Sequence, residues 1–280
     1  MQLWKEIGLG AHYLASTPLR RKAAVRRAAL ALEPVRVLFY HRVADSHPND
    51  WTMSHRRFAQ QIAWLKTRFD IVSLAEAQAR IQSGKNRWPT ACITFDDGYA
   101  DNCDFAIPLL LRQQLPFTYF VASGHALEQR PFAHDLAIGQ PLQPNTPEQI
   151  VALANAGVAI GAHTRNHADL GKSSDPGFLH DEIVGSKLDL ENLIGGPVSY
   201  FAFPFGQHRQ LTPAAFDVAR GAGFAGVCSA YGGYNWPGDD PFHLQRIHAD
   251  PEMVRFKNWL TIDPRKDRRG RKLTSKGTDG

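Results

Sequence analysis

Cysteine is scarce in this sequence. The chain of 280 residues has three cysteines, Cys92, Cys103 and Cys228, and they are widely separated. An odd and scattered set of this kind excludes a disulfide framework, and also a structural zinc site built from cysteine. We therefore predict that all three side chains are small buried hydrophobic groups.

Long apolar runs are absent as well. The longest, such as residues 28–32 and 35–40, are far shorter than the roughly 18 to 20 apolar residues that a membrane-spanning helix needs. The N-terminal segment contains Glu6 and His12 and has no uninterrupted apolar stretch, so it does not resemble a secretory signal. The sequence predicts a cytoplasmic protein without a transmembrane helix.

Positive charge is missing from the central part of the chain. The net charge is +5, but residues 37–262 contain 18 basic and 22 acidic residues, so the excess of Lys and Arg lies at the two ends. A nucleic-acid-binding protein carries its positive charge on the folded surface. We therefore expect no nucleic acid partner.

The two basic ends differ in pattern. Residues 1–34 are predicted to form a basic amphipathic helix, because basic and apolar residues between Leu19 and Leu30 recur at helical spacing. Such a helix suits peripheral contact with a membrane of anionic lipids, and it equally suits packing on the domain as a solvated helix. Residues 263–280 have few apolar side chains and are predicted to be a basic disordered tail.

Residues 35–262 show a regular alternation of short apolar segments and amphipathic helices, which predicts one α/β domain. Helices are expected after N-caps such as Ser54, Ser73 and Thr146, and further helices at residues 101–113, 175–193 and 212–222. Strands separated by helices form a parallel sheet, and the number of units favours closure into a barrel. The expected strands are residues 35–40, 90–95, 116–121, 158–162, 199–203 and 224–228.

Two adjacent carboxylates, Asp96 and Asp97, follow the expected strand 90–95 and precede Gly98. Consecutive side chains on extended backbone start in opposite directions, so one carboxylate can bind a metal ion while the other stays free as a base. An Asp-Gly pair is also a common turn at the end of a strand. The pair on its own does not decide between these interpretations.

His163 and His167 follow the expected strand 158–162. At positions i and i+4 we expect them to face the same way on a helical turn, with Cβ atoms roughly 6 Å apart, which suits two nitrogens bound to one ion. The carboxyl ends of parallel strands meet at one rim, so the histidines and the Asp pair should share it. Two histidines and one carboxylate fit zinc, and also cobalt, nickel or iron.

The segments TFDDG (residues 94–98) and HTRNH (residues 163–167) resemble the first two motifs of the NodB-type polysaccharide deacetylases, carbohydrate esterase family 4. This resemblance implies a distorted (β/α)7 barrel with outer helices, and a metal-dependent hydrolase that removes acetyl groups from N-acetylhexosamine-containing polysaccharides. It also implies that Asp96 is the general base and that Asp97, His163 and His167 hold the metal.

The third motif departs from the family pattern. The family usually has Arg-x-Pro-aromatic-Gly, whereas residues 202–206 read AFPFG, with Ala202 in the place of the arginine. Some exopolysaccharide-type members combine such an alanine with an arginine on a late strand, and Arg246 resembles that arginine. We therefore expect Arg246 to pair with Asp96. A surface ion pair is the alternative interpretation of Arg246.

A general acid must protonate the leaving amine, because an amide anion is a very poor leaving group. His41, within FYHRV at residues 39–43, resembles a histidine of the poly-N-acetylglucosamine deacetylase branch, and we prefer it to His248 for this role. Two other functions stay open at this point. One is a metal amidohydrolase of a small N-acyl compound, and the other is a glycan-binding protein that keeps the fold without catalysis.

Overall fold

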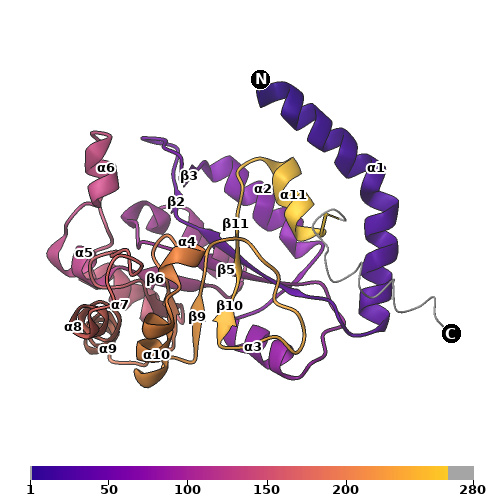
Figure 1. The fold of residues 1–280 in the computed structure, drawn as a ribbon. Coiled ribbons are helices and arrows are strands. Elements are labelled where there is room, and N and C mark those ends of the chain that lie inside the picture. The colour runs from indigo at the N-terminus through magenta and orange to yellow at the C-terminus, as the bar shows by residue number, and fades with distance from the viewer. Residues whose placement is uncertain (1, 264–280) are drawn as a thin grey trace.

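Parallel strands form the central sheet of the molecule (Figure 1). The computed structural model describes residues 2–263. Strands β1 (Val35–Tyr40) and β5 (Thr90–Phe95) pair in register along their whole length. The sheet continues from β5 through β6 (Thr118–Val121), β7 (Ala159–Ala162), β8 (Tyr200–Ala202) and β9 (Gly226–Cys228), each parallel to its neighbour.

One segment near the end of the chain closes this sheet into a barrel. β10 (His243–Leu244) pairs with β9, and β11 (Arg246–His248) pairs with β1 on the other edge. Only Gln245 separates the two strands in sequence, so they are two halves of one strand position. The distorted seven-position parallel barrel that the sequence predicts is confirmed. β4 (Asp70–Ile71) pairs with the start of β5, and β2 (Arg42–Val43) with β3 (Thr52–Met53) beside the barrel.

Helices surround the barrel, as predicted. Several begin at predicted N-caps, whose hydroxyl oxygens accept a hydrogen bond from the backbone N–H three residues further on. Ser54 caps α2, Ser73 caps α3 and Thr146 caps α7. The bounds are α2 His55–Lys66, α3 Leu74–Gln82, α7 Pro147–Asn155, α8 Pro176–His180, α9 Ser186–Ile194, α10 Pro213–Gly221 and α11 Met253–Leu260. A π-helical turn, η2 (Asp181–Gly185), joins α8 to α9 within the predicted helix 175–193.

Three helical regions differ from the sequence-based expectation. The predicted helix 101–113 is a 3-10 turn, η1 (Ala100–Cys103), followed by α4 (Ala106–Arg112). The short helices α5 (Ser123–Glu128) and α6 (Ala133–Ala137) were not predicted, and neither was α11. None of these three has a side-chain N-cap hydrogen bond, and α5 and α6 are too short to show a helical period. A second 3-10 turn, η3 (His208–Gln210), precedes α10.

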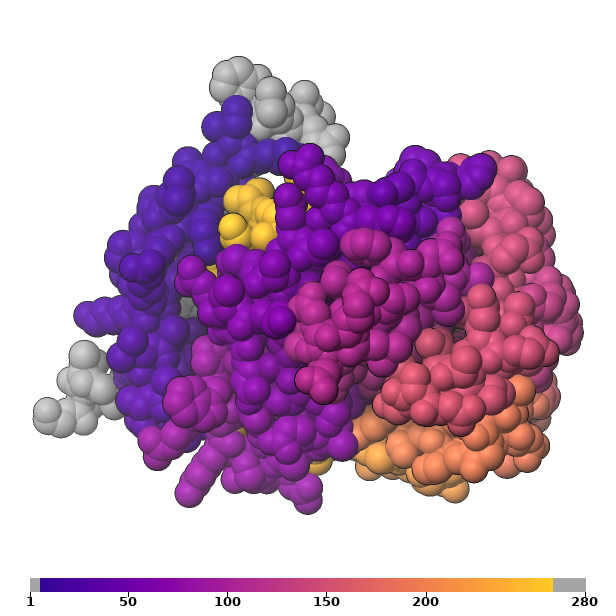
Figure 2. Space-filling view, turned by 180° about the vertical axis from the view of Figure 1, so that it is seen from behind, coloured from indigo at the N-terminus to yellow at the C-terminus, as the bar shows by residue number. Residues whose placement is uncertain are grey.

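The first helix, α1 (Gln2–Ala29), lies within the segment predicted to be helical. It runs along the side of the barrel beside α2 and α11, on the opposite side of the molecule from α6 (Figure 1). The view from behind shows α11 between α1 and the barrel (Figure 2). No helix in residues 2–263 is long and apolar enough to cross a membrane. The predicted disordered tail, apart from Asp263, lies outside the described residues.

A cluster of apolar side chains fills much of the barrel interior. Val35 and Val37 of β1, Cys92, Phe120 and Cys228 form one buried cluster inside it, together with residues of α3. Cys92 and Cys228 are therefore buried, as predicted. The prediction is wrong for Cys103, which is half-buried at the end of η1. A larger core fills the space between the strands and the outer helices.

Candidate active site

A cleft opens at the carboxyl-terminal end of the barrel strands. Its volume is about 350 Å³. Its walls come from the segments that follow β1, β5, β7, β8 and β9, from the β2–β3 region and from α6. The lining residues are Phe39, His41, Trp51, Asp96, Asp97, His134, His163, His167, Phe203, Phe205, Gln207 and Ala230. Five of the six residues that we preferred for catalytic or metal-binding roles thus line one cleft, and the sixth, Arg246, is hydrogen-bonded to one of them, Asp96.

The two adjacent aspartates separate into different interactions, as expected for extended backbone. Asp96 continues from β5, while Asp97 has a left-handed backbone with φ +74°, followed by Gly98 at φ +81°. Aspartate tolerates this conformation better than most residues do. The turn directs Asp96 towards Arg246 and Asp97 towards the two histidines. Both carboxylates are almost fully buried.

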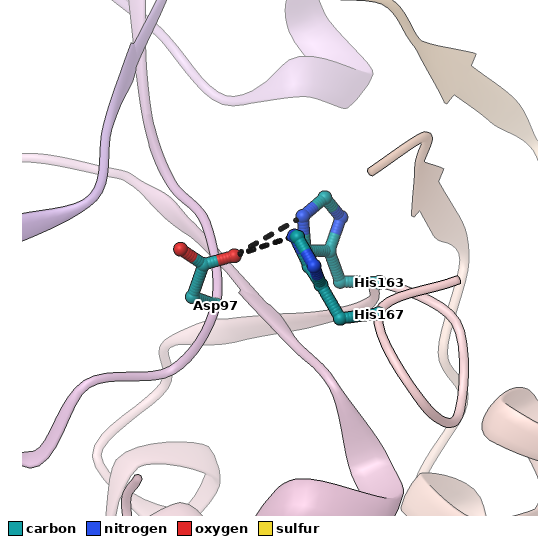
Figure 3. Close-up of side chains that lie close together, drawn as sticks. All are labelled: Asp97, His163 and His167. Atoms are coloured by element: carbon teal, nitrogen blue, oxygen red, sulfur yellow. Dashed lines mark ion pairs between the residues drawn. The ribbon is translucent and has the colours of Figure 1, made fainter. Parts of the chain in front are cut away.

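His163 and His167 converge on Asp97, but not through a helical turn (Figure 3). The prediction of a helix at this point is wrong, because the segment is a loop with left-handed backbone at Thr164 and His167. Glu182 on η2 holds this loop. Its carboxylate accepts hydrogen bonds from the backbone N–H and side-chain amide of Asn166, at 2.9 and 2.7 Å. The loop curls so that both imidazoles face the same carboxylate.

The three side chains fit a metal ion. Asp97 Oδ1 lies 3.4 Å from His163 Nε2 and 3.2 Å from His167 Nε2. Two ligands of a tetrahedral zinc ion, each at ~2.1 Å, are about 3.4 Å apart. Asp97 Oδ1 is buried without a hydrogen-bond partner among the described residues. His163 Nδ1 lies 2.8 Å from the carbonyl oxygen of Ala202, so this nitrogen donates and Nε2 keeps its lone pair for a cation.

Arg246 reaches Asp96 from β11. Its Nη1 and Nη2 donate to the two carboxylate oxygens at 2.6 and 2.8 Å, and its Nε donates to the carbonyl of Ser229. The guanidinium is fully buried and lies over the rings of Phe39 and Phe120. Burial raises the pKa of Asp96, but the positive charges of Arg246 and the nearby histidines, His163 and His41, together outweigh this, so the pKa is below its ordinary value. Asp96 is therefore ionised at neutral pH.

The third motif contributes in a different way from the family pattern. Ala202 has no side chain to pair with Asp96, but its carbonyl orients His163. Further along, Phe205 has a left-handed backbone with φ +62° and an exposed ring at the edge of the cleft. Non-glycine residues in this conformation are uncommon, and here four of them, Asp97, Thr164, His167 and Phe205, lie around one opening.

His41 lies in the cleft, whereas His248, the other candidate acid, does not line it. Burial lowers the pKa of His41, and the charges of Asp97 and Asp96 oppose this shift. Its Nδ1 is buried and has no hydrogen-bond partner among the described residues. A buried polar atom without a partner is uncommon in a folded protein.

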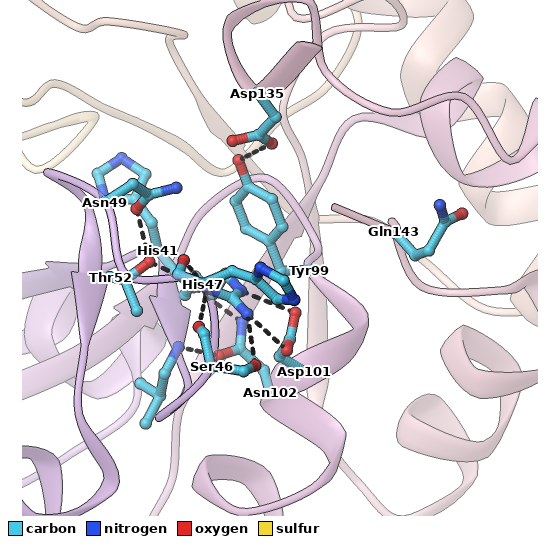
Figure 4. Close-up of polar contacts among 12 residues, drawn as sticks. His41, Ser46, His47, Asn49, Thr52, Tyr99, Asp101, Asn102, Asp135 and Gln143 are labelled. Atoms are coloured by element: carbon cyan, nitrogen blue, oxygen red, sulfur yellow. Dashed lines mark hydrogen bonds and ion pairs between the residues drawn. The ribbon is translucent and has the colours of Figure 1, made fainter. Parts of the chain in front are cut away.

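A polar network beneath the cleft holds the His41 segment in place (Figure 4). The buried amide of Asn102 donates to the carbonyl of His41 at 2.8 Å and accepts from the backbone N–H of Val43 at 2.9 Å. Next to it, Arg42 donates to both carboxylate oxygens of Asp101, each at 2.8 Å. Both Asn102 and Asp101 belong to η1, so this turn fixes the position and direction of the backbone that carries His41.

Sequence reasoning missed His134 and Trp51, which also line the cleft. Tyr99 has a single proton and donates it to Asp135 at 2.8 Å, so His134 Nε2 donates to the Tyr99 oxygen at 2.9 Å. The ring of Trp51 lies edge-on to His134, with centroids 4.8 Å apart. Neither residue follows a strand of the main sheet, so no pattern in the sequence marks them.

The comparisons with known proteins agree with this arrangement. The family model for polysaccharide deacetylases matches residues 83–227 of this chain. The chain belongs to the polysaccharide deacetylase family. The matched part contains both aspartates and both histidines, and it ends before Arg246. Membership in the family makes the chain a hydrolase of the deacetylase class, and the resemblance stated from the two motifs is confirmed.

Individual relatives are similar to this chain over most of its length. YxkH of Bacillus subtilis (strain 168), which is named as a polysaccharide deacetylase, is 24% identical over 220 residues, covering 78% of this chain and 72% of that protein. The structure of IcaB from Ammonifex degensii superposes with a TM-score of 0.69 at 25% identity, covering 82% of this chain and 98% of IcaB. The structure of the Streptococcus pyogenes deacetylase PplD superposes with a TM-score of 0.68 at 19% identity, covering 82% of this chain and 98% of PplD.

Proposed function

We propose that this chain is a divalent-metal-dependent deacetylase that removes N-acetyl groups from an N-acetylhexosamine-containing glycan, such as an exopolysaccharide or a chitin-like or peptidoglycan-like polymer. The observation that carries the proposal is the position of one ionised carboxylate, Asp96, directly beside a buried Asp-His-His group in an open cleft. Family membership supplies the acetylated polysaccharide as substrate class. The residues supply a hydrolytic mechanism for it.

In this proposal Asp97, His163 and His167 hold the cation, with zinc as the first choice and cobalt, nickel or iron as further fits for such a donor set. When bound, the cation supplies Lewis acidity, which lowers the pKa of water and stabilises the negative charge that develops on the carbonyl oxygen. Because the side chains of Asp96 and Asp97 point in different directions, the carboxylate of Asp96 does not bind the cation and is free for proton transfer.

Asp96 is the general base of the proposed reaction. It accepts a proton from the attacking water, and this requires the carboxylate to be ionised before the reaction starts. Arg246 meets this requirement electrostatically, and its two parallel hydrogen bonds also fix the plane of the carboxylate. An arginine on β11 thus takes over the function that the family pattern assigns to the position of Ala202.

His41 is the proposed general acid. An amide, unlike an ester, needs its leaving nitrogen protonated, so the cleft of an N-deacetylase must contain a proton donor. Burial lowers the pKa of His41, which makes its protonated form a stronger acid than a free imidazolium. The carboxylates of Asp97 and Asp96 favour that protonated form. The imidazole of His41 lines the cleft, so it is the group from which we expect the proton to come.

The volume of the cleft and its aromatic edges fit a sugar ring. Trp51 and Phe205 line the cleft, and half of Phe205 is exposed to solvent. Flat aromatic faces bury the apolar face of a pyranose, while His134 and Gln207 offer polar groups between them. A chain of sugars can enter because the cleft is open at its edge. We therefore expect oligomers to be better substrates than the single sugar.

The proposal is tested by measuring acetate release from N-acetylglucosamine oligomers before and after removal of metal with a chelator, and again after addition of zinc. We expect release to stop on metal removal and to return with zinc. Replacement of Asp96 by Asn should lower the rate by about 10² to 10⁴, the range typical of a general base. Asp104, an exposed carboxylate directly after η1, provides the control variant Asp104→Asn, which should keep full activity.

Unchanged acetate release after complete metal removal would contradict the mechanism. Binding of oligomers without release, unaffected by Asp96→Asn, would indicate a glycan-binding protein instead. Release from small N-acyl compounds but not from glycans would indicate a small-molecule amidohydrolase.

A further inference from the structure

A second hollow lies on the side of the barrel, between α1 and the carboxyl-terminal ends of α2 and α11. We call it the α1 groove. Its volume is about 380 Å³, which is within the range of small-ligand sites. Its walls are Tyr13, Leu14, Thr17, Arg20, Arg21, Ala24, Arg27, Glu33, Arg36, Trp64, Arg68, Phe69, Pro89, Lys257, Leu260 and Thr261. The proposed active site has no residue in common with these walls.

Part of the positive charge around the α1 groove has a structural role. Arg36 donates to the carbonyl of Leu260 at 2.9 Å and to Glu33. Arg20 of α1 donates to the carbonyl and the side-chain oxygen of Asn258. The last carbonyl groups of a helix have no hydrogen-bond partner within the helix. The two buried guanidinium groups donate to such carbonyls at the end of α11, and in this way they attach α1 to the barrel.

Three further cations at the α1 groove have no such role. Arg21, Arg68 and Lys257 have no ion pair with an acidic side chain of the described residues. Arg21 and Arg68 are exposed, and the Lys257 ammonium lies 5.9 Å from the ring centre of Trp64. Glu33 is the one acidic residue among the described groove walls, and Arg27 and Arg36 already pair with it. The groove therefore presents positive charge above an apolar floor.

An apolar stripe on the outer face of α1 continues from the groove. Ile7, Leu14, Arg21 and Val25 are spaced so that they lie on one face of the helix. Ile7, Leu14 and Val25 are 53%, 72% and 70% exposed. Leu14 and Arg21 also line the groove, so the stripe and the groove form one continuous surface.

We propose that the α1 groove and the outer stripe of α1 together dock this protein on a membrane surface that contains anionic phospholipids. The phosphate of a lipid headgroup lies between Arg21, Arg68 and Lys257. Ile7, Leu14 and Val25 insert into the boundary between headgroups and acyl chains, as the apolar face of an interfacial helix does. The helix lies on the membrane and does not cross it.

The aliphatic stripe distinguishes this partner from an acidic polysaccharide. A polyanionic glycan would satisfy the three cations, but it would leave Ile7, Leu14 and Val25 in water, whereas a lipid interface accommodates both kinds of side chain. The orientation is also suitable, because α1 and α6 lie on opposite sides of the molecule (Figure 1). A protein docked through α1 leaves the cleft beside α6 open to a glycan.

The test is sedimentation of the full chain with vesicles of phosphatidylcholine, with and without phosphatidylglycerol, at 0.1 M salt. We expect binding that requires phosphatidylglycerol and weakens at 0.5 M salt. The triple variant Arg21→Gln, Arg68→Gln, Lys257→Gln should bind about a hundredfold more weakly, because each cation near an anionic surface contributes roughly a fivefold gain in binding. A second variant, Ile7→Ser, Leu14→Ser, Val25→Ser, should also lose binding, although it keeps every charge.

The matched control removes three exposed cations elsewhere, Arg112→Gln, Lys172→Gln and Arg209→Gln, and should keep most of the binding. Equal loss in the control and in the groove variant would overturn the proposal. Equal binding to vesicles without phosphatidylglycerol would also overturn it, as would binding of dextran sulfate or glycerol phosphate at the groove in the absence of vesicle binding. Docking is independent of the proposed catalytic function. The Asp97→Asn variant should bind vesicles normally, and the groove variant should keep full activity on soluble oligomers.

Discussion

The cleft and the junction of α1 with the barrel both contain a buried carboxylate that is paired with arginine. In the cleft, Arg246 forms two hydrogen bonds with Asp96, and at most 3% of either side chain is exposed. At the junction, Glu33 pairs with Arg27 and Arg36, and 2% of its side chain is exposed. In both places burial raises the pKa of the carboxyl group, but neighbouring positive charge outweighs this effect and the pKa is lowered. The charge comes from Arg36 and Arg27 at Glu33, and from Arg246 together with histidines at Asp96.

The surroundings of the two carboxylates are different. Asp96 lines a cleft, next to three side chains that fit a metal ion. Glu33 lies between a helix and the first strand, and both of its oxygens are occupied by guanidinium groups. A buried carboxylate with a perturbed pKa is therefore not sufficient to identify a catalytic group. Open space for a substrate beside it, and further groups that act on the same bond, make the difference.

The largest effect on activity should come from Asp97→Asn. Asparagine tolerates the left-handed backbone at this position, so the fold should persist, but the site loses its one anionic ligand. We expect acetate release to fall by about 10³ or more, since a Lewis acid supplies several kcal/mol of transition-state stabilisation. Metal content per chain, measured by elemental analysis, should fall in parallel. Full metal content together with lost activity would show that Asp97 is not a ligand.

Arg246→Met should combine loss of activity with loss of stability. The remaining carboxylate of Asp96 would be buried without its partner, which typically costs about 3–5 kcal/mol. Burial would then raise the pKa of Asp96, so the acidic limb of the profile of kcat/KM against pH should move to higher pH. Arg246→Lys keeps the charge and should show a smaller displacement of that limb. If the limb stayed in place in both variants, Asp96 would not be the titrating base.

Glu33→Gln should separate stability from catalysis. We expect the free energy of unfolding at pH 7 to fall by about 3–5 kcal/mol, with kcat unchanged on soluble oligomers. The pKa of Glu33 is lower in the folded chain than the ordinary value of 4.5, so its stabilisation is complete above about pH 4.5 and is lost as the pH falls through the folded value. That acid-dependent loss should be absent from the thermal unfolding of the variant. A large fall in kcat would contradict the contrast drawn between the two clusters.

Asn102→Ala should have the smallest effect. It removes the two hydrogen bonds that hold the backbone on either side of Arg42, so His41 should lose its fixed position. We expect kcat to fall roughly tenfold, with a smaller change in KM, because misplacement of a catalytic group affects the reaction more than substrate binding. Tyr119→Phe removes another partner of the same amide and should preserve kcat. Equal losses of kcat in both variants would indicate a general loss of packing.

The barrel could be predicted from the sequence because its strands are locally marked. β1 and β5 each consist of six consecutive buried residues, and their predicted bounds are confirmed to the residue. The helices with side-chain N-caps were also predicted, whereas α5, α6 and α11 were not. These three lack the local signal of a cap and take their structure from packing against the rest of the chain.

The candidate site also divides into residues that local sequence patterns predict and residues that depend on packing between distant segments. The aspartates and His163 directly follow strands, so their position at the rim follows from parallel topology. The curled loop that brings His167 to Asp97 depends on Glu182, which is distant in sequence, and the helical turn expected there was therefore wrong. His134 and Trp51 reach the cleft from segments outside the main sheet. Their contribution follows only from the three-dimensional structure.

The strand that completes the barrel also delivers the guanidinium to Asp96. β10 and β11 are the last strands of the sheet, and Arg246 is the first residue of β11. During synthesis the two aspartates emerge about 150 residues before this arginine, as their sequence positions require. Until the end of the domain has been made and has docked, burial would favour the protonated, inactive form of the base. The reactive charge state is therefore coupled to completion of the fold.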